Sequence, residues 1–375
     1  MYVGKEQDID MYILGGGQCV GASCYYLKLG KHSILLDCGT GSLNGVSYHP
    51  DFFGLLQTGA VQSLSQISSV FISHAHMDHV GALGDFMREV PAASLYMTAL
   101  TRVLAEKQLQ QYGRNFSQAR LLQNSVEVAY GQEIAFSDFK VKFLPAGHVP
   151  GAMMMLFSYC GRNILYTGDY SLAASPLTME AVVPMEEIDT LIMCGLHARH
   201  RYYSSGSSYA QLGDLLKYYV QNNKSLYIKV KQLSKGVELL KLINLVLAGE
   251  VPVYIGRSVF EVVRRFDEVG IPILGKNNLL DNGFRPPGLH VVISSLPADR
   301  DIRARYHYVD GDVPLHDGFA DTLEFIRRIN PRRAVVVHSP PSFRDDDESV
   351  EQYLMYDAGC RTQFVFPENG DYITL

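Results

Sequence analysis

The segment Phe71–His79 constrains the fold of this chain more than any other feature of its sequence. The short apolar run Val70–Ile72 is typical of a buried strand. It leads directly into three histidines and one aspartate within six positions, His74, His76, Asp78 and His79, in a chain that has only twelve histidines. Strand-end side chains on such a tight loop can aim at two neighbouring points in space. Imidazole and carboxylate donors without a nearby thiolate pair favour zinc or a similar divalent ion, so the motif predicts a metal site.

Two later strand-end residues extend this set of candidate ligands. Val141–Leu144 is typical of a strand and leads to His148, which lies between glycines. Asn163–Tyr166 is a second such run, and Asp169 follows it after a short turn. Either residue alone would more often be an ordinary loop residue. Together with the first motif they give six candidate ligands: His74, His76, Asp78, His79, His148 and Asp169.

The N-terminal part is predicted to be a β-hairpin, formed by Cys24–Leu29 and Ser33–Asp37 around a two-residue turn. Asp37 ends the second strand, where an acid could orient a metal-binding histidine from behind. A lone aspartate at such a place is more often a turn former. The glycines at 15–17 do not predict a dinucleotide site, because position 20 is Val20 and a strand follows them, not a helix.

Length and composition allow two or three domains with a sizeable core: 375 residues, of which 47% are hydrophobic and 19% charged. No run of about 18 uncharged apolar residues occurs, so we expect no membrane span. The N-terminus does not resemble a secretory leader. The six cysteines form no C-x-x-C pair, which favours idle thiols in a reducing compartment. We therefore expect a cytoplasmic protein.

The net charge of −6 conceals an asymmetry along the chain. Residues 194–308 contain 16 Lys and Arg against 9 Asp and Glu, whereas the remainder contains 17 against 30. A basic insert in an acidic body with a metal site would suit a polyanionic substrate. Charge also varies along chains without such a cause, so the asymmetry is only supporting evidence.

These residues, in this order and in these contexts, resemble the metallo-β-lactamase superfamily, whose fold is an αββα sandwich with its metals at one edge of two packed sheets. The resemblance rests on Asp37, the His74–His79 motif, His148 and Asp169. It implies that His74, His76 and His148 surround one zinc ion, that Asp78 and His79 hold a second, and that Asp169 bridges the two.

Two later histidines are similar to motifs of the β-CASP branch, the nucleic-acid-processing members of this superfamily, which include ribonuclease J. His316 begins the run His-Asp-Gly-Phe-Ala-Asp, and His338 follows the strand-like segment Arg333–Val337. The resemblance implies that His316 protonates the leaving group and that His338 completes the second zinc site. In this branch DNA-acting members usually carry valine at the second position, so His338 favours RNA. The end of the chain, Phe364–Asp371, also resembles the end of such catalytic cores.

The resemblance implies a fold and a function. We expect an α/β protein with a metallo-β-lactamase domain, residues 1–193 and 309–375, and a smaller inserted β-CASP-like α/β domain, residues 194–308. We expect a two-zinc metallohydrolase that cleaves phosphodiester bonds in RNA rather than DNA, with Asp78 and His316 as catalytic residues. No membrane partner is expected, and a protein partner or a homo-oligomer is allowed.

One departure from the branch concerns the residue that normally partners the leaving-group histidine. An acid is expected after Leu191–Met193, but the residue is Cys194, and no carboxylate occurs between Asp189 and Asp214. His316 would then lack the partner that raises its pKa. Other aspartates could substitute, and the candidates are Asp310, Asp312 and Asp317.

Substrate contacts are predicted from basic residues in the insert. Arg199, His200 and Arg201 lie beside two tyrosines and could pair with phosphate and stack on bases, or form a solvated loop. Lys235 lies in a strand-loop-helix segment that resembles the branch, although an ordinary βα crossover would also explain it.

Two alternative functions remain open. One is a hydrolase of the same superfamily that acts on a small ester, thioester or phosphodiester, which a closed pocket would favour. The other is an inactive scaffold subunit of an RNA-processing assembly, which Cys194 supports and the complete ligand set disfavours. Metal analysis distinguishes these alternatives, because either enzyme would hold zinc tightly and the scaffold would hold none.

Overall fold

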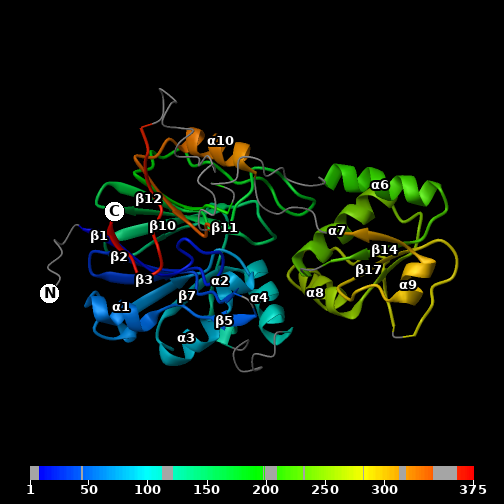
Figure 1. Cartoon of the computed structure of the whole chain (residues 1–375), viewed down its shortest axis with the longest axis horizontal. Coiled ribbons are helices and arrows are strands. Elements are labelled where there is room, and N and C mark those ends of the chain that lie inside the picture. Colours follow the sequence, from blue (N-terminus) through cyan, green and yellow to red (C-terminus); the bar gives the residue numbers. More distant parts are fainter. Residues whose placement is uncertain are drawn as a thin grey trace. The chain divides into compact units, whose positions relative to one another are not determined.

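The computed structural model describes most of the chain, namely residues 8–43, 45–111, 121–196, 198, 209–230, 233–281, 283–311, 318–340 and 361–375. The chain forms two compact units (Figure 1). Unit 1 comprises Met1–Ala173, Glu180–Ser204 and His316–Leu375, and unit 2 comprises Ala174–Met179 and Ser205–Leu315. The domain limits expected from the sequence, between residues 193 and 194 and between residues 308 and 309, remain a prediction.

Unit 1 contains two seven-stranded sheets. The first has the order β21-β1-β2-β3-β6-β7-β8, with β1 (Ile9–Gly15), β2 (Cys24–Leu29), β3 (His32–Leu36), β6 (Ile67–Phe71), β7 (Ser94–Thr98), β8 (Val126–Val128) and β21 (Tyr372–Thr374). The second has the order β20-β19-β13-β12-β11-β10-β9, with β9 (Glu133–Ala135), β10 (Phe139–Pro145), β11 (Met153–Tyr159), β12 (Arg162–Tyr166), β13 (Thr190–Cys194), β19 (Arg333–Val337) and β20 (Gln363–Val365). A separate hairpin pairs β4 (Gly41–Leu43) with β5 (Val46–Tyr48).

The hydrophobic core of unit 1 lies between these two sheets. Alternate residues of each strand enter it, as the two-residue period of a strand requires. Tyr25 and Leu27 of β2 belong to the same buried cluster as Met155 and Phe157 of β11. Phe71 contacts both sheets, because its ring stacks on Tyr96 of β7 at 4.7 Å and meets Phe157 edge-on at 5.4 Å. The core therefore fixes the two sheets against each other.

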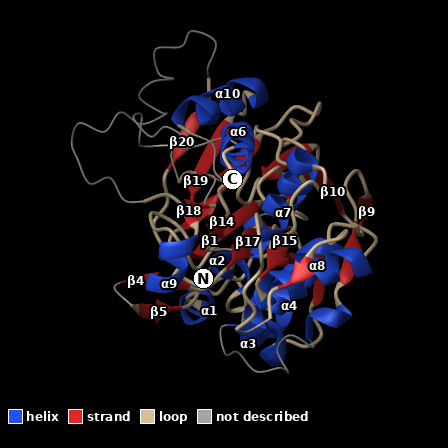
Figure 2. Cartoon of the chain, turned by 90° about the vertical axis from the view of Figure 1, so that its right-hand side faces the viewer, coloured by secondary structure: helices blue, strands red, loops and turns tan. Residues whose placement is uncertain are grey.

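Helices cover the outer faces of both sheets (Figure 1). The first sheet is covered by α1 (Phe52–Thr58), α3 (Leu83–Glu89) and α4 (Ala99–Gln111). The second is covered by α10 (Phe319–Ile329), which Figure 2 shows beside β19 and β20. Asp51 caps α1 by accepting a hydrogen bond from the Gly54 amide at 2.8 Å. The layers are helix, sheet, sheet and helix, so the predicted αββα sandwich is confirmed.

The histidine motif itself contains a short helix, α2 (Met77–Val80). The helix begins here because the carbonyl of His76 accepts hydrogen bonds from the amides of His79 and Val80. The described residues of the unit also form two short 3-10 turns, η1 (Leu64–Gln66) and η2 (Leu122–Asn124).

The carboxyl ends of several parallel strands lie at one edge of the two sheets. In the first sheet β3 and β6 are parallel, and in the second β12, β13 and β19 are parallel. Strand β10 runs in the same direction as β12, because both are antiparallel to β11. The residues that follow these strands must therefore lie at a common edge within unit 1.

Unit 2 has a five-stranded sheet in which all neighbouring strands are parallel. Its order is β16-β15-β17-β14-β18, with β14 (Leu226–Lys229), β15 (Val253–Ile255), β16 (Asn278–Leu279), β17 (Val291–Ser294) and β18 (His307–Asp310). Helices among its described residues are α6 (Tyr209–Gln221), α7 (Leu233–Leu247), α8 (Arg257–Glu268) and α9 (Arg300–Arg305). Figures 1 and 2 show α9 on the opposite side of the strands from α7 and α8. The predicted inserted α/β domain is confirmed.

Among the described residues no helix has both the length and the apolar character needed to cross a bilayer.

Candidate metal centre

Four buried side chains converge at the common edge of unit 1. They are His74 and His76 after β6, His148 after β10 and Asp169 after β12. The Nδ1 of His76 lies 3.1 Å from the Nε2 of His74 and 3.2 Å from the Nε2 of His148. The Oδ2 of Asp169 lies 3.7 Å from each of those two Nε2 atoms. All four candidate donor atoms lie within 4.8 Å of one another.

A second group lies directly beside the first. It comprises Asp78, His79 and His338, whose donor atoms also lie within 4.8 Å of one another. The Nε2 of His338 is 3.7 Å from the Oδ2 of Asp78. Asp169 faces this group as well, because its Oδ1 is 3.6 Å from the Nε2 of His79. The two oxygens of Asp169 therefore point to different groups. The structure brings together all seven side chains predicted as metal ligands, including His338 from the far end of the chain.

Asp37 supports this cluster from behind. Its buried carboxylate accepts hydrogen bonds from the Nδ1 of His79 at 2.7 Å, from the amide and hydroxyl of Ser73 at 2.7 Å, and from the hydroxyl of Tyr166. Burial and Asp37 raise the pKa of Tyr166 well above its usual value, so the phenol stays protonated and remains a donor. The bond to Nδ1 leaves the Nε2 of His79 facing Asp169.

His338 is held in an equivalent manner by Ser23, whose hydroxyl oxygen lies 2.8 Å from Nδ1 of the ring. The backbone of both His338 and Asp37 adopts the left-handed region, with φ of 49° and 58°. Few residues other than glycine do so, and such strain is concentrated at functional sites. The amide of His338 bonds to the carbonyl of Gly16 at 2.6 Å, which fixes the turn that directs its ring to the cluster.

Gly39 allows the loop after β3 to approach the histidine motif. A Cβ atom at Gly39 would lie 1.7 Å from the carbonyl oxygen of Asp78. Main-chain hydrogen bonds connect the two loops, from the amide of Cys38 to His79 at 2.8 Å and from the amide of Thr40 to Met77 at 3.0 Å. Glycine is therefore required for this close contact.

The geometry of the seven side chains fits divalent-metal binding. The single Nδ1 of His76 cannot satisfy two imidazole nitrogens by hydrogen bonding, since it carries at most one hydrogen. The Nε2 of His79 is buried and accepts or donates no hydrogen bond within the part of the chain that the structure describes. Zinc–nitrogen bonds of about 2.0–2.1 Å would give a tetrahedral edge of about 3.3–3.4 Å, close to the observed 3.1 and 3.2 Å separations.

The electrostatics of the cluster also favour a cation. Burial and the neighbouring His79, His76 and His148 lower the pKa of His74 well below its usual value, so its ring is neutral. Burial alone would lower the pKa of His79, but Asp169, Asp37 and Asp78 raise it to about 10. Without a metal, the positive charge of protonated His79 therefore compensates the negative charge of the neighbouring carboxylates. A divalent ion that displaced this proton would supply the same compensation.

Cys194 lies at the end of β13, where the sequence departs from the β-CASP pattern. Its buried thiol hydrogen-bonds to Asp169. Burial and Asp169 raise the pKa of this thiol well above its usual value, so it is a neutral donor and not a thiolate. The position therefore contacts the candidate metal ligands without adding a negative charge.

Several predicted site residues are not placed by the structure. His316, Arg199, His200 and Arg201 lie outside the described residues, as do the possible substitutes Asp312 and Asp317. Asp310 ends β18 in unit 2. Lys235 lies in α7 of unit 2 and is only 8% exposed.

Three supporting residues were missed by sequence reasoning: Ser23, Ser73 and Tyr166. Ser73 precedes His74 and Tyr166 precedes the Thr-Gly-Asp turn, so their closeness to candidate ligands was a usable signal. Ser23 has no such signal, because it contacts a residue 315 positions away.

Comparison with known proteins agrees with this geometry. Residues 17–225 match the family described as the metallo-beta-lactamase superfamily. Cleavage and polyadenylation specificity factor 73 of Drosophila melanogaster is 30% identical over 65% of this chain and 38% of its own length. Integrator complex subunit 11 of Danio rerio is 31% identical over 44% of this chain and 30% of its own length. The "Probable RNase MJ4" of Methanocaldococcus jannaschii is 28% identical over 49% of this chain and 45% of its own length.

The chain thus spans less than half of the length of these curated relatives. A crystal structure of a protein of unknown function from Enterococcus faecalis V583 matches 98% of this chain and 100% of that one, with a TM-score of 0.69. Its sequence identity is 14%, so this likeness concerns the fold alone.

Proposed function

Because the chain belongs to the metallo-β-lactamase superfamily, in its β-CASP branch, we propose that it is a two-zinc nuclease that hydrolyses phosphodiester bonds in RNA. The observation that carries this proposal is the position of Asp169. One of its oxygens faces His74 and His148 at 3.7 Å and the other faces His79 at 3.6 Å. A carboxylate shared in this way is what two adjacent cations require, and two-metal sites are common in nucleases.

The seven side chains would hold the two ions in the proposed roles. His74, His76 and His148 would bind one, Asp78, His79 and His338 the other, and Asp169 both. When bound, such ions lower the pKa of a water to about 7 and neutralise charge on phosphate oxygens.

The protein's own groups would prepare the site for this chemistry. Asp37 and Ser23 fix the rings of His79 and His338 through their Nδ1 atoms, so that each Nε2 is presented to the cluster. Burial of the histidines excludes competing water from the donor atoms. His316 is the proposed donor of a proton to the departing oxygen.

RNA is the proposed substrate for two reasons. The three relatives named above include one whose name states RNase and one whose name states cleavage and polyadenylation. In this chain the residue at the later histidine position is His338, which lies in the cluster through its Nε2. Arg199, His200, Arg201 and Lys235 stay proposed substrate contacts.

Location and partners are also part of the proposal. The five described cysteines, Cys19, Cys24, Cys38, Cys160 and Cys194, are free thiols. Free thiols fit a reducing compartment such as the cytoplasm. The names of two relatives refer to a complex subunit or a specificity factor, which supports a protein partner.

The proposal is tested by cleavage of labelled single-stranded RNA with the zinc-loaded chain. We expect wild-type protein to cleave the RNA and His76→Ala to lose at least about 100-fold of the rate, since metal catalysis supplies several kcal/mol. His32→Ala is the matched control, because His32 is a partly exposed residue that pairs with Asp138 away from the cluster. Equal cleavage by wild type and His76→Ala would reject the assignment. Retained zinc without RNA cleavage would favour a small-molecule hydrolase, and absence of zinc would favour a scaffold.

A further inference from the structure

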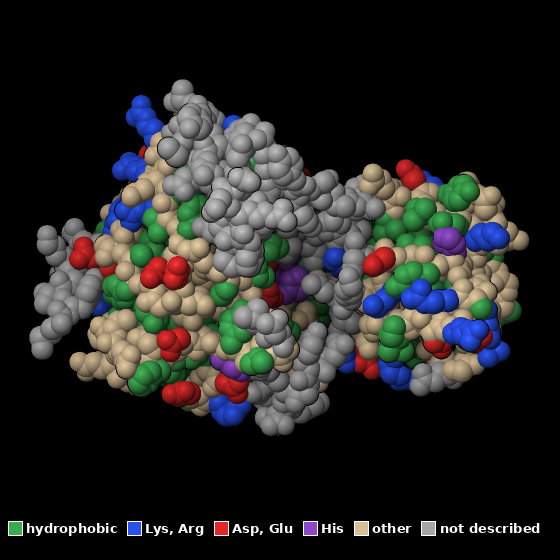
Figure 3. Space-filling view, viewed as in Figure 1, with side chains coloured by type: hydrophobic (Ala, Val, Ile, Leu, Met, Phe, Trp, Pro, Cys, Tyr) green, Lys and Arg blue, Asp and Glu red, His purple; other side chains and the backbone are tan. Residues whose placement is uncertain are grey.

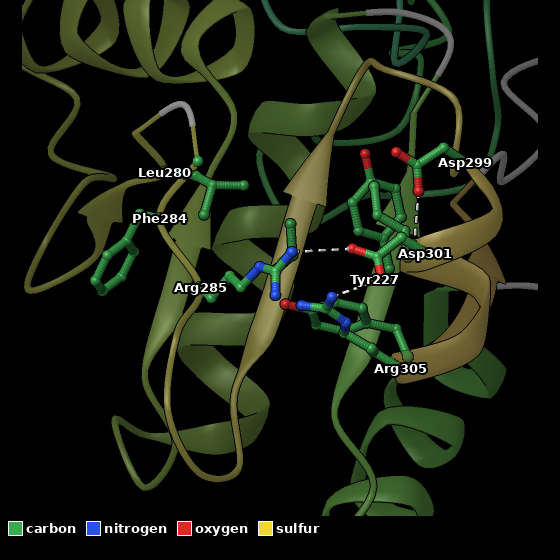
Figure 4. A pocket seen from close by; sticks show the side chains of 11 residues that line it. Tyr227, Leu280, Phe284, Arg285, Asp299, Asp301 and Arg305 are labelled. Atoms are coloured by element: carbon green, nitrogen blue, oxygen red, sulfur yellow. Dashed lines mark hydrogen bonds and ion pairs between the residues drawn. The ribbon is translucent and has the colours of Figure 1, made fainter.

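A pocket lies in unit 2 on the side of the sheet that carries α9 (Figure 4). Its floor follows from the strand register. Tyr254, Val292, Tyr227 and Tyr308 are register partners across β15, β17, β14 and β18. Because the valine is small and stands between two tyrosines, a hollow forms above it. The pocket has a volume of about 260 Å³ and is bounded by α9 and by the loop that contains Phe284 and Arg285.

Aromatic rings with anchored hydroxyl groups line this pocket. The hydroxyl of Tyr227 donates to the carbonyl of Leu296 at 3.0 Å, and the hydroxyl of Tyr306 lies 2.9 Å from the Nε2 of His290. The rings of Tyr227 and Tyr306 meet at 6.0 Å with an angle of 64° between their planes. Since these contacts hold the hydroxyl groups, the rings offer the pocket a fixed aromatic surface.

The polar side of the pocket contains two guanidinium groups and two carboxylates. Asp301 pairs with Arg305 and, at 3.6 Å, with Arg285 (Figure 4). Asp299 caps α9, because its Oδ1 accepts a hydrogen bond from the Ile302 amide at 2.8 Å. Its Oδ2 has no hydrogen-bond partner among the residues that the structure describes. The pocket therefore offers charged donors and an available acceptor at the same time.

This combination excludes two simple occupants. A phosphate would meet two carboxylates and two guanidinium groups that already face Asp301, so the lining has no net charge to attract it. A purely apolar group would offer no donor to the Oδ2 of Asp299 and would leave this acceptor without a partner. The volume lies below the roughly 300–1,000 Å³ of pockets that enclose a drug-sized ligand, so it suits one planar ring system.

We infer that this pocket binds an unpaired guanine base of single-stranded RNA. Guanine presents the O6 and N7 acceptors that arginine recognises and N–H donors on its Watson–Crick edge that a carboxylate such as Asp299 accepts. Aromatic rings stack on unpaired bases in most RNA-binding sites. On the face that Figure 3 shows, Lys and Arg side chains over this unit lie among hydrophobic and acidic ones, and the basic side chains offer contacts for flanking phosphates.

The inference rests on the proposed RNA substrate, and binding is therefore measured separately from cleavage. Short fluorescent oligouridines of equal length, with a single central guanosine or a single central adenosine so that neither pairs with itself, are titrated with the full chain carrying His76→Ala in the presence of EDTA. We expect the guanosine RNA to bind about tenfold more tightly, the discrimination of one good bidentate contact.

Asp299→Asn tests the carboxylate without removing the helix cap, because asparagine caps helices as well as aspartate does. We expect it to weaken binding of the guanosine RNA about tenfold and to leave the adenosine RNA within twofold. Asp51→Asn is the matched control, since Asp51 caps α1 in the same way in unit 1. Arg285→Ala should weaken guanosine binding severalfold more than Arg264→Ala, a similarly exposed arginine that pairs with Glu268.

Equal affinity for the two RNAs, or an unchanged Asp299→Asn variant, would overturn the inference. If wild-type protein nevertheless cleaves RNA, the proposed function stands and the pocket inference alone fails. If no RNA is cleaved but guanosine-dependent binding is lost in Asp299→Asn, the pocket inference stands and the proposed function fails.

Discussion

The carboxylate of Asp37 accepts a hydrogen bond from the Nδ1 of His79 at 2.7 Å, and both side chains are buried. This bond selects the tautomer in which Nε2 carries a lone pair. Asp37→Asn can turn its NH2 group towards Nδ1 and so favour the other tautomer. We expect the weaker of two zinc affinities to fall by about 10- to 100-fold, measured by competition with a chromophoric chelator. Asp85→Asn on the exposed face of α3 should have wild-type affinity. Unchanged affinity in Asp37→Asn would contradict the proposed support of His79.

The contact between Gly39 and Asp78 gives a prediction about stability. Gly39→Ala would place a Cβ atom 1.7 Å from the Asp78 carbonyl oxygen, so the two loops must separate. We expect urea unfolding of the metal-free protein to show a loss of about 3 kcal/mol or more. Gly161→Ala is the control, because Gly161 has a φ of 74° and no atom near its Cβ position. Its strain alone should cost about 1–2 kcal/mol. Equal losses in the two variants would show that the loops are not tightly packed.

The hydrogen bond between Cys194 and Asp169 predicts a difference between metal-free and zinc-loaded protein. Cys194→Asp places a second buried carboxylate beside Asp169, and like charges disfavour ionisation. We expect the metal-free variant to lose about 2–3 kcal/mol, and zinc to raise its Tm more than it raises the Tm of wild type. Thermal unfolding with and without zinc measures both effects, and Cys194→Ser serves as the uncharged control. An equal zinc-dependent rise in the Tm of all three proteins would show that Cys194 does not interact with the metal centre.

Glu238 in unit 2 gives a prediction about pH. Burial raises the pKa of this carboxyl, despite hydrogen bonds from Ser175 and Tyr209 and the nearby charge of Lys235. The folded state therefore binds this proton more tightly than the unfolded state. The contribution of Glu238 to stability is complete below the unfolded pKa of about 4.5 and is lost as the pH rises through the folded pKa.

Glu238→Gln removes this pH dependence. We expect the free energy of unfolding of wild type minus that of Glu238→Gln to decrease as the pH rises from about 4.5 to neutrality. Urea unfolding at several pH values measures the difference. Glu268→Gln, on the exposed face of α8, should show no such trend. If this difference in the free energy of unfolding increased with pH, the pKa of Glu238 would not be raised in the folded state.

The sequence was sufficient to predict the seven-residue cluster because each member follows a strand. The carboxyl ends of parallel strands meet at one edge, and the order of the motifs identified the fold that brings β6, β12 and β19 together. His338, more than 250 positions from His74, was included because its motif resembles the second of the later histidine motifs of the β-CASP branch. The sequence also located Cys194 as a departure, although not its contact with Asp169.

Other features depend on contacts that no local pattern encodes. Tyr166 reaches Asp37 across 129 positions, and Ser23 reaches His338 across 315. The pocket of unit 2 depends on which residues of β14, β15 and β17 are register partners, so Val292 has no special signal in the sequence. Lys235 is predicted as a substrate contact because its segment resembles the strand-loop-helix of the branch, and this stays a prediction. The sequence did not indicate that Lys235 lies in α7 with only 8% exposure.

The central claim is that Asp169 bridges two bound metal ions, and the zinc-to-protein ratio tests it most directly. Metal-free protein is loaded with zinc, separated from free metal by gel filtration and analysed by mass spectrometry of the metal. The account predicts close to two zinc ions per wild-type chain and one or fewer in Asp169→Asn. A wild-type chain that retains no zinc, or an Asp169→Asn chain that retains as much as wild type, would contradict it.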